Sequence, residues 1–257
     1  MPASRRNPRI KAIFFDFMGT CLDWHTSVLA AFPTSIPRDD ASSLAIAWRH
    51  TYFASNAARL AANLPPENID TTLRNTLLAV LDQDPHSQYR SLFLKKNEND
   101  NHNNHDNDNN NNDPITNSIS AFHSITPWPD VPPAISTLQS QGYETFVFAN
   151  GCRSSGLRFD MLFSSELLGV YKPARESYER VLDFVEVRPE ESVMVAAHAY
   201  DVRGAKAVGM RTVYVRRWTD DVDEMGDEER VRVVKGENDA FLGEGGMEGL
   251  VEALGGL

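Results

Sequence analysis

The sequence is poor in cysteine, which sets the first limit on the kind of protein it encodes. Among its 257 residues there are two cysteines, Cys21 and Cys152. Two cysteines cannot form the framework of a disulfide-rich secreted domain, and such scarcity is typical of a reducing compartment. We expect both side chains to pack as small apolar groups rather than to act as nucleophiles.

Clusters of basic residues are also missing. The 25 lysines and arginines are outnumbered by 36 acidic residues, and the formal net charge is −11. Proteins that bind nucleic acids carry basic stripes, so we expect no nucleic-acid partner. An anionic small-molecule substrate would have to be bound by individual basic side chains that oppose the overall negative field.

Long hydrophobic runs are absent as well. No run approaches the roughly 18 apolar residues of a membrane span, and the apolar stretch after the basic N-terminal segment is interrupted by Lys11 and Asp16. We therefore expect no signal peptide and no membrane partner, and we predict a cytoplasmic protein. The sequence leaves the oligomeric state open, with a homodimer as one alternative.

What the sequence does contain is a predicted strand that ends in an aspartate. Ile10 to Phe15 is largely apolar, Asp16 follows at once, and Gly19 with Thr20 forms a turn signal. In open α/β sheets, ligands bind at the carboxyl ends of the strands. An aspartate there can be a covalent nucleophile, a metal ligand or a proton carrier. The structural alternative is an aspartate that caps the next helix.

The following region has a helical pattern. Apolar residues recur at helical spacing over 43–60 and 73–81, without strand-like alternation. We predict a helical cap domain at 23–125, inserted between two segments of one core domain, 1–22 and 126–257. Within the cap, residues 97–113 are rich in asparagine, and we predict a disordered loop there. Its two histidines, His102 and His105, are expected to be solvated rather than to bind metal.

Strands and helices then alternate, which is typical of a parallel sheet with helices on both faces. A rigid proline turn at 126–132 precedes them. The expected strands are 144–149, 192–197, 212–215 and 231–234. The expected helices are 134–141, 155–161, 176–184, 202–208 and 247–254, with a short segment at 167–170. The predicted fold class is α/β, with a Rossmann-like doubly wound parallel core and the inserted helical cap.

Polar residues follow four strand-to-loop junctions of this core. Each has a structural reading of its own: a cap, a turn, a solvated lysine or the start of a helix. Because the carboxyl ends of parallel strands meet at one edge, we expect the four groups to converge. They are Asp16 with Thr20, Asn150-Gly151, Lys172-Pro173, and His198 with Asp201.

Taken together, these motifs resemble the haloacid dehalogenase superfamily, and most of all its 2-haloacid dehalogenase branch (type II). The matching pieces are FFDFMGTCLD at 14–23, PWPDV at 127–131, ANG at 149–151, VYKP at 170–173 and the stretch that ends in Asp201. That family also has a helical cap after its first strand, with an arginine near the start of a cap helix. Arg49 fits that position.

The resemblance implies a reaction. Asp16 would attack carbon 2 of a haloacetate or 2-haloalkanoate, expel halide and form an ester, which water would hydrolyse to a 2-hydroxy acid. Lys172 would orient Asp16, and Arg49 would close from the cap on the halide and the substrate carboxylate. Asp201 would hold Lys172 and help to position the water.

Further residues are assigned by the same resemblance. The Thr20 hydroxyl and the backbone N–H groups of Asn150 and Gly151 would bind carboxylate groups. Tyr178 would support the lysine region, and Met18 would line the substrate site. No cofactor or metal is expected for this reaction.

A phosphatase is the alternative. Phosphatases of this superfamily carry a second aspartate two residues after the nucleophile, which protonates the alkoxide leaving group. This chain has Met18 there, and a halide needs no proton. Phosphatases also need Mg²⁺, for which Asp16 and Asp201 are the candidate ligands.

The chain departs from the family pattern at several positions. Ala149, Ala196 and Ala197 replace polar residues, and His198 replaces the usual asparagine. His198 has two readings: a packed, hydrogen-bonded replacement, or a group that activates the hydrolytic water or donates to the departing halide. The lost hydroxyls also leave open a third class, a non-catalytic binding protein on this scaffold.

Overall fold

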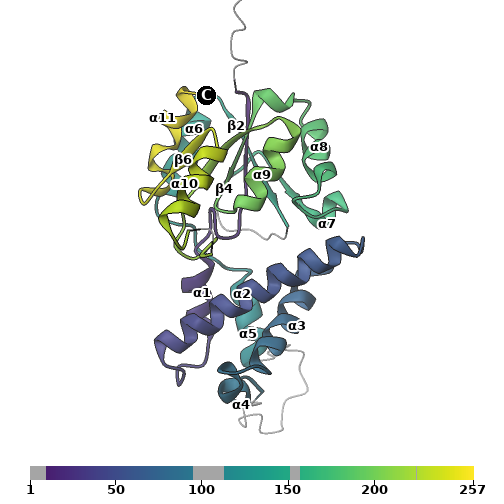
Figure 1. Cartoon of the computed structure of the whole chain (residues 1–257), viewed down its shortest axis with the longest axis vertical. Helices are drawn as coiled ribbons and strands as arrows, with labels where there is room; N and C mark the ends of the chain where they lie inside the picture. Colours follow the sequence, from purple (N-terminus) through teal and green to yellow (C-terminus); the bar gives the residue numbers. More distant parts are fainter. Residues whose placement is uncertain (1–9, 95–112, 151–156, 224) are drawn as a thin grey trace, which may run out of the picture. The chain divides into compact units, whose positions relative to one another are not determined.

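The computed structural model describes residues 10–94, 113–150, 157–223 and 225–257. The chain divides into two compact units (Figure 1). The first comprises Met1–Asp23 and Thr126–Leu257, and the second comprises Trp24–Ile125. The predicted disordered loop lies outside the described residues, as do His102 and His105, except for its last residue, Asp113.

The first unit is built on a six-stranded parallel sheet. Its strands are β1 (Ala12–Phe15), β2 (Glu144–Ala149), β3 (Met161–Ser164), β4 (Ser192–Ala196), β5 (Arg211–Val215) and β6 (Ala240–Leu242). Their order across the sheet is β3-β2-β1-β4-β5-β6. The chain moves outward from β1 to β3 and then crosses back to β4 on the other side of β1. The β1–β4 boundary is therefore a topological switch point, and the predicted doubly wound parallel core is confirmed.

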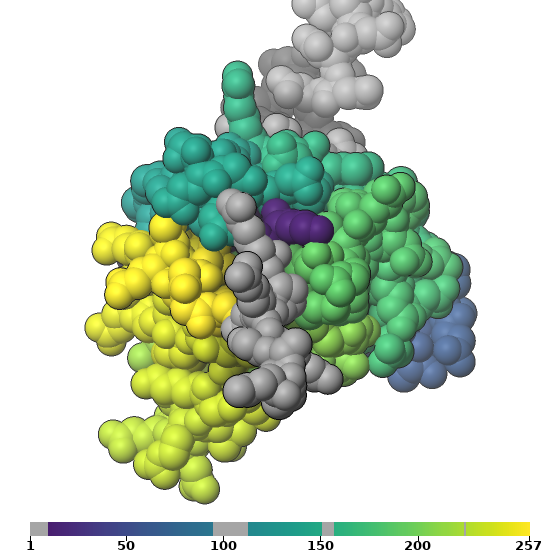
Figure 2. All heavy atoms as spheres, turned by 90° about the horizontal axis from the view of Figure 1, so that it is seen from above, coloured from purple at the N-terminus to yellow at the C-terminus, as the bar shows by residue number. Residues whose placement is uncertain are grey.

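Helices cover both faces of this sheet, so its central strands are buried on both sides. One face packs against α8 and α9 through residues such as Phe14 and Phe148, and α6, which contacts β2 and α11, covers the other. Figure 1 shows α8 and α9 on one side of β1 and α6 with α11 on the other, and in Figure 2 the green residues lie on one side of the purple N-terminal residues and the teal and yellow residues on the other. The helices of this unit are α6 (Val131–Ser140), α7 (Ser165–Leu168), α8 (Arg175–Phe184), α9 (Ala199–Val208), α10 (Glu228–Glu237) and α11 (Leu250–Gly255), with 3₁₀ turns η2 (Pro189–Glu191) and η3 (Gly246–Gly249).

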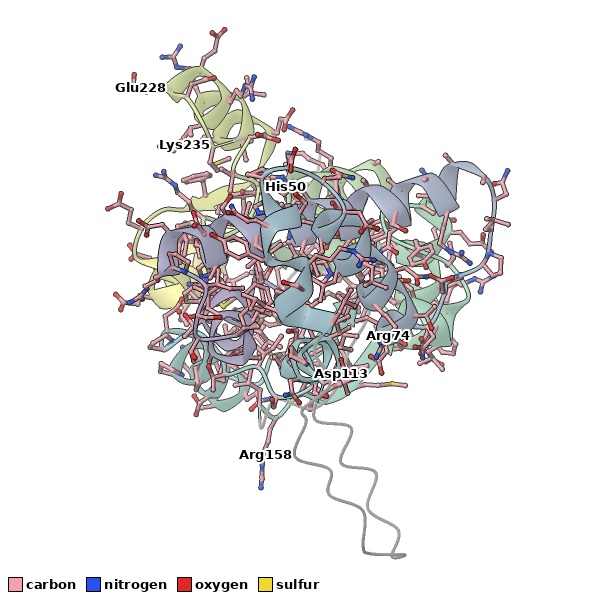
Figure 3. All side chains as sticks on the ribbon, turned by 90° about the horizontal axis from the view of Figure 1, so that it is seen from below. His50, Arg74, Asp113, Arg158, Glu228 and Lys235 are labelled. Atoms are coloured by element: carbon pink, nitrogen blue, oxygen red, sulfur yellow. The ribbon has the colours of Figure 1, made fainter. Side chains whose placement is uncertain are left out.

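The described residues of the second unit are helical and enclose an aromatic core. Its elements are α1 (Trp24–Ala31), α2 (Arg38–Ala61), α3 (Ile69–Leu81), η1 (His86–Tyr89), α4 (Arg90–Leu94) and α5 (Pro114–Ala121). Trp48 of α2 contacts the rings of Phe32 and Phe122, and its Nε1 donates to the Leu73 carbonyl oxygen at 3.0 Å. Asp113 caps α5 and lies near Arg74 (Figure 3).

The predicted helix at 155–161 is wrong for its described residues, 157–161, and its first two residues lie outside the described part of the chain. Met161 begins the edge strand β3, whose Leu162 pairs with Val147 of β2. Asp160 extends the pairing, because its Oδ2 accepts from the Thr145 N–H at 2.7 Å. The free edge of β2 thus decides the conformation of a segment whose local pattern was helical. The segment expected at 167–170 is the end of α7 and the turn after it.

The predicted strand at 231–234 is also wrong, because these residues lie in α10. Asp227 caps this helix by accepting from the Arg230 N–H at 2.9 Å. Val234 is buried and Val231 is partly buried, whereas Val233 is half exposed, so the less exposed valines are three residues apart, as on one face of a helix. The strand of this region is β6, which the sequence analysis missed.

Two helices begin earlier than predicted. Helix α9 starts at Ala199 instead of 202, and α6 starts at Val131, with two prolines in its first turn, where a rigid turn was expected. Proline is compatible with a first turn because its missing N–H has no intrahelical partner there. Among the described residues, every helix is too short or too polar to span a membrane.

Candidate active site at the switch point

Asp16 follows β1 directly, at the boundary where the strand order reverses. Its backbone N–H still donates to the Val195 carbonyl of β4 at 3.0 Å, so the residue continues the parallel pairing. The chain then turns through Gly19, whose φ of 91° favours glycine. Cys21 is buried behind this turn, and its Sγ donates to the Asp16 carbonyl at 3.3 Å, in agreement with the packing role expected for it; Cys152 lies outside the described residues.

Three side chains contact the carboxylate of Asp16, which is only 4% exposed. The Lys172 Nζ donates to Oδ1 at 2.9 Å, the Thr20 hydroxyl donates to Oδ2 at 2.6 Å, and the His198 Nδ1 lies 3.0 Å from Oδ2. Burial alone would raise the pKa of Asp16. Attraction to Lys172 and His198 outweighs burial and lowers this pKa below its usual range, so the carboxylate is ionised at neutral pH.

Lys172 is buried between two aspartates. Its Nζ donates to Asp16, to Asp201 Oδ2, and to the Phe148 carbonyl at 2.7 Å. Burial lowers the pKa of a lysine, but the two carboxylates outweigh it and raise the pKa of Lys172. The ammonium therefore stays charged beside the nucleophile candidate. The predicted pairing of Asp16, Lys172 and Asp201 is present in the structure.

Asp201 lies in the first turn of α9, fully buried. Burial raises the pKa of its carboxyl, against the opposing effect of Lys172. The Tyr178 hydroxyl of α8 donates to Asp201 Oδ1 at 2.7 Å. Tyr178 lies so close to α9 that a Cβ at Gly204 would come within 2.6 Å of its hydroxyl oxygen. Tyr178 thus contacts the lysine region through Asp201.

Asn150 holds the backbone of Lys172 instead of facing an open site. Its Oδ1 accepts from the Lys172 N–H at 2.9 Å and from the Ser165 hydroxyl at 2.6 Å. This fixes the loop from which the lysine reaches Asp16. Gly151, the other residue of this predicted pair, lies outside the described residues.

His198 lies between two carboxylates, and one of them was missed in the sequence analysis. Its Nδ1 is 3.0 Å from Asp16 and its Nε2 is 3.0 Å from Asp220 Oδ1. Burial opposes the charged ring, yet Asp16 and Asp220 raise the pKa of His198 to about 10. At neutral pH the ring is an imidazolium, which has no lone pair with which to take a proton from water.

Asp220 follows β5, a fifth strand end of the same sheet edge. The sequence signal was Thr219-Asp220-Asp221 after the strand predicted at 212–215, a group that the sequence analysis did not single out. Asp221 accepts from the Ala199 N–H at 2.5 Å and so caps α9. Burial raises the pKa of Asp221.

Arg217 was also missed. Its guanidinium donates to both oxygens of Asp130, at 3.1 and 2.9 Å, and its Nε donates to the Thr20 carbonyl at 3.1 Å. Trp128 donates to the Gly19 carbonyl at 2.8 Å. These contacts fix the turn after Asp16 to α6 and to the loop after β5. The motif PWPDV therefore supports the turn and supplies none of the groups that contact the Asp16 carboxylate.

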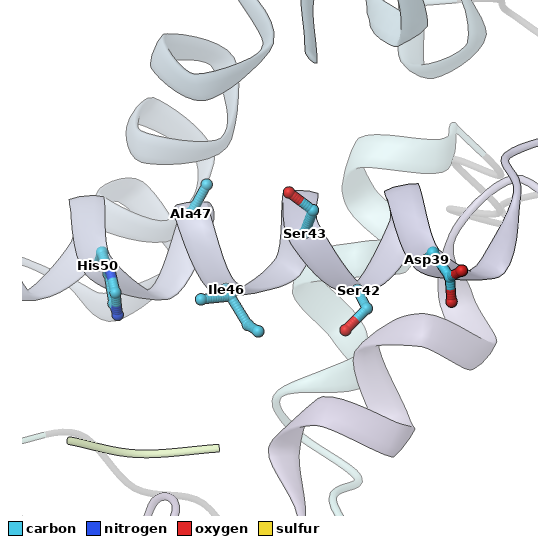
Figure 4. A pocket seen from close by; sticks show the side chains of 6 residues that line it. All are labelled: Asp39, Ser42, Ser43, Ile46, Ala47 and His50. Carbon is cyan, nitrogen blue, oxygen red and sulfur yellow. The ribbon is translucent and has the colours of Figure 1, made fainter. Parts of the chain in front are cut away.

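Arg49 belongs to the second unit and is buried on α2. Its guanidinium lies over three aromatic rings, with centroid distances of 4.3 Å to Phe53, 5.5 Å to Trp24 and 5.6 Å to Tyr52. Aromatic faces attract a cation and shield it from water. The same helix carries a hollow on one face (Figure 4), lined by Asp39, Ser42, Ser43, Ile46, Ala47 and His50.

The remaining predicted residue, Met18, is half buried in the turn after β1 and forms a bridge with Leu22. Within the described part of the chain, no group of three or more His, Cys, Asp or Glu side chains is arranged to hold a metal ion. The first unit thus brings together an ionised, buried carboxylate and two cations, Lys172 and His198. Such a carboxylate can attack an electrophilic carbon when that carbon carries a good leaving group.

Known proteins provide a comparison for this site. A sequence model of the haloacid dehalogenase-like hydrolases matches residues 10–209. Over 109 residues the chain is 29% identical to (S)-2-haloacid dehalogenase 1 of Pseudomonas sp. (strain CBS-3). This match covers 38% of this chain and 48% of that protein. The match thus spans about half the length of this curated relative.

Two further likenesses cover more of the chain. Over 224 residues it is 28% identical to a glyceraldehyde 3-phosphate phosphatase of Pyrococcus furiosus, a match that covers 81% of each protein. The fold of this chain is similar to that of L-2-haloacid dehalogenase from Xanthobacter autotrophicus, with a TM-score of 0.70 and 20% identity. The match covers 96% of this chain and 99% of that one.

Proposed function

The chain belongs to the haloacid dehalogenase-like hydrolases, and we propose that it hydrolyses the carbon–halogen bond of a short 2-haloacid through an ester on Asp16. One observation carries the proposal. The buried carboxylate is ionised and flanked by two cations, while Met18 stands where a proton donor for the leaving group would be needed.

In the first step, Asp16 Oδ1 attacks carbon 2 and the halide leaves with the bonding electrons. The substrate and the nucleophile are both anions, and their repulsion grows as water is excluded. Lys172, which donates to the attacking oxygen Oδ1, offsets this repulsion. Arg49, whose charge lies among aromatic rings in the cap, binds the halide and the substrate carboxylate. This role of Arg49 is part of the proposal.

In the second step, water attacks Cγ of the Asp16 ester and the 2-hydroxy acid leaves. The water oxygen becomes part of the Asp16 carboxylate, and Oδ1 leaves as the hydroxyl oxygen of the product. Asp201 helps to position the water and holds Lys172 in place. Tyr178 and Asn150 act indirectly, because one contacts Asp201 and the other fixes the Lys172 backbone.

The nature of the leaving group decides between dehalogenation and phosphate-ester hydrolysis. An alkoxide is a strong base and leaves slowly without general-acid help, which contributes about 10²–10⁴-fold. A halide is a very weak base and leaves without a proton. Met18 is therefore compatible with halide release and unfavourable for phosphate esters.

The carboxylate oxygens of Asp16 and Asp201, as they are arranged here, do not suit a magnesium ion as ligands. Lys172 and His198 already occupy the two oxygens of Asp16, and Lys172 also occupies Asp201 Oδ2. A divalent cation bound to these oxygens would lie beside two positively charged groups that repel it. We therefore propose a reaction without a metal cofactor, on a small anionic substrate.

Halide release is the direct test. Purified protein is incubated with chloro-, bromo- and fluoroacetate and with both enantiomers of 2-chloropropionate, and free halide is measured. The expected result is release from at least one substrate, with no release by Asp16→Asn. A single turnover in H₂¹⁸O followed by mass spectrometry of the Asp16 peptide should show the label in Asp16. Folded parent protein that releases no halide from any of these acids would reject the proposal.

A phosphatase is the second candidate, because the likeness to the phosphatase of Pyrococcus furiosus covers 81% of both chains. Mg²⁺-dependent hydrolysis of a generic aryl phosphate, abolished by Asp16→Asn, would favour it. With an aryl phosphate the leaving group is a weaker base than an alkoxide, so the lack of an acid at Met18 matters least there. This assay therefore gives phosphatase activity its best chance to appear.

A further inference from the structure

The two oxygens of the Asp16 carboxylate have different surroundings. Among the described residues, Oδ1 accepts from Lys172, whereas Oδ2 accepts from the Thr20 hydroxyl at 2.6 Å and faces His198 Nδ1 at 3.0 Å. The Thr20 oxygen itself accepts the Ala197 N–H at 2.8 Å. That bond orients the hydroxyl, so its hydrogen points to Oδ2. One oxygen thus lies beside a single cation, and the other faces two fixed donors.

The protonation of His198 follows from its neighbours. Each ring nitrogen lies 3.0 Å from an aspartate oxygen, Nδ1 from Asp16 and Nε2 from Asp220. An ionised carboxylate only accepts hydrogen bonds, so both nitrogens must carry a hydrogen. The ring is then a cation that donates in both directions.

Asp220 is itself held in place. The Thr219 hydroxyl donates to its Oδ2 at 2.7 Å. Its carboxylate fills the space beside Gly19, where a Cβ would lie 2.5 Å from both oxygens. The glycine turn after the nucleophile therefore admits the aspartate that orients the histidine.

We propose that Thr20 and His198 form an oxyanion hole on Oδ2 of Asp16 for hydrolysis of the ester, and that Asp220 is the positioning residue that keeps His198 in its donating form. The inference rests on the proposed function, because it concerns the second step of that reaction. It assigns His198 the opposite role to a base that takes a proton from water.

In the second step, water hydrolyses the Asp16 ester. Oδ1 carries the substrate carbon, so Oδ2 is the carbonyl oxygen of the ester. Water bonds to Cγ, and the electron pair of the C=O bond moves to Oδ2, where Thr20 and His198 stabilise the negative charge. The pair returns as the Cγ–Oδ1 bond breaks. One water proton ends on the alkoxide of the hydroxy acid, and the other goes to solvent when the Asp16 carboxyl ionises.

The pH dependence separates a donor from a base. The groups around the His198 ring are Asp16 from β1, Asp220 and Asp221 from the loop after β5, and Tyr200 from α9, with Lys172 beyond Asp16. The carboxylates favour the protonated ring, whose pKa is about 10 in the free protein. A donor loses activity as pH rises through its pKa, whereas a base gains activity.

The first experiment uses His198→Ala. Mixing with excess substrate should give a rapid burst of halide, up to one per protein molecule, followed by turnover about 10²–10³-fold slower than in the parent, the usual loss for one oxyanion donor. Mass spectrometry of the quenched protein should show the Asp16 ester accumulating. A variant that loses the burst together with the turnover, or keeps the turnover of the parent, would overturn the assignment.

The second experiment uses Asp220→Asn, which retains an acceptor for Nε2 and removes the charge. We expect the rate of ester hydrolysis to fall at a lower pH than in the parent. Asp221→Asn is the comparison, because it removes the adjacent carboxylate, which caps α9 by accepting from the Ala199 N–H; its decline should shift less than that of Asp220→Asn. A rate that rises with pH in parent and variant would show that His198 acts as a base.

A third measurement does not depend on substrate. In ¹⁵N-histidine NMR spectra, His198 should carry hydrogens on both ring nitrogens at neutral pH in the parent and titrate at lower pH in Asp220→Asn. A neutral His198 at pH 7 in the parent would overturn the inference whatever the activity. Halide release by the parent with no burst in His198→Ala would reject only the oxyanion hole, whereas no release by the parent would reject the proposed function and this step with it.

Discussion

Replacing Lys172 with methionine should destabilise the first unit strongly, and the loss should shrink in acid. The Lys172 ammonium is fully buried between Asp16 and Asp201, both of which it contacts. Methionine fills much of the same volume but leaves two buried carboxylates without their cation. Breaking a buried ion pair in this way costs about 3–5 kcal/mol of unfolding free energy.

The pH dependence of this loss has a definite sign. In the parent, the folded-state pKa of Asp16 is lowered, so its contribution to stability is present at neutral pH and is lost as pH falls towards that low value. Without Lys172, burial raises the folded-state pKa of Asp201 further above its unfolded value, whereas Asp16 keeps its contact with His198. The variant should therefore gain stability relative to the parent as pH falls from 7 to 5, by about 1.4 kcal/mol for each unit of raised pKa crossed.

Urea unfolding at pH 5 and pH 7.5, followed by tryptophan fluorescence, measures both effects. Lys11→Met is the control, because Lys11 is exposed and Glu191 keeps its ion pair with Arg188, so the loss should be about 1 kcal/mol or less. The double variant Lys172→Met/Asp201→Asn should be more stable than Lys172→Met alone. A loss below 1 kcal/mol with an unchanged pH dependence would refute this account of the buried charges.

Three further outcomes are expected. Tyr178→Phe removes the hydroxyl that donates to Asp201 at 2.7 Å, so its unfolding free energy should fall by about 1–3 kcal/mol, and an unchanged urea midpoint would contradict this. Gly204→Ala places a Cβ within 2.6 Å of the Tyr178 hydroxyl oxygen, so overpacking should cost about 1–3 kcal/mol, whereas a stabilised variant would show that the two helices separate freely. Because the pKa of His198 is raised to about 10, its stabilising effect should be complete below pH 6.5 and decline towards pH 10; the difference in stability between parent and His198→Ala should shrink over this range, and a constant difference would contradict it.

The sheet and the grouping of side chains around Asp16 were predictable from the sequence, because both depend on local signals. Apolar runs that end in a polar residue locate β1, β2 and β4, and parallel strands bring their carboxyl ends to one edge. This was sufficient to place Asp16 with Lys172, His198 and Asp201.

The rest could not be predicted because it depends on partners far away in the chain. Asp220 stands among other acidic residues, and only the fold singles it out by placing it against His198. Arg217 likewise gains its role from Asp130 and the turn at Thr20. The edge strand β3 forms because β2 offers an unpaired edge, which its own sequence cannot indicate. That the side chain of Asn150 holds Lys172 was not predicted, and the expected role of its backbone N–H in substrate binding stays a prediction.

The position of Asp220 has a consequence for how this protein can be shortened. The family match ends at residue 209, which suggests a natural place to trim the chain. A protein cut there would keep Asp16, Lys172 and Asp201, yet it would lose the carboxylate that fills the space beside Gly19. The surroundings of Asp16 are therefore completed by residues of the last quarter of the chain, and a minimal version of this protein would have to extend past the loop that follows β5.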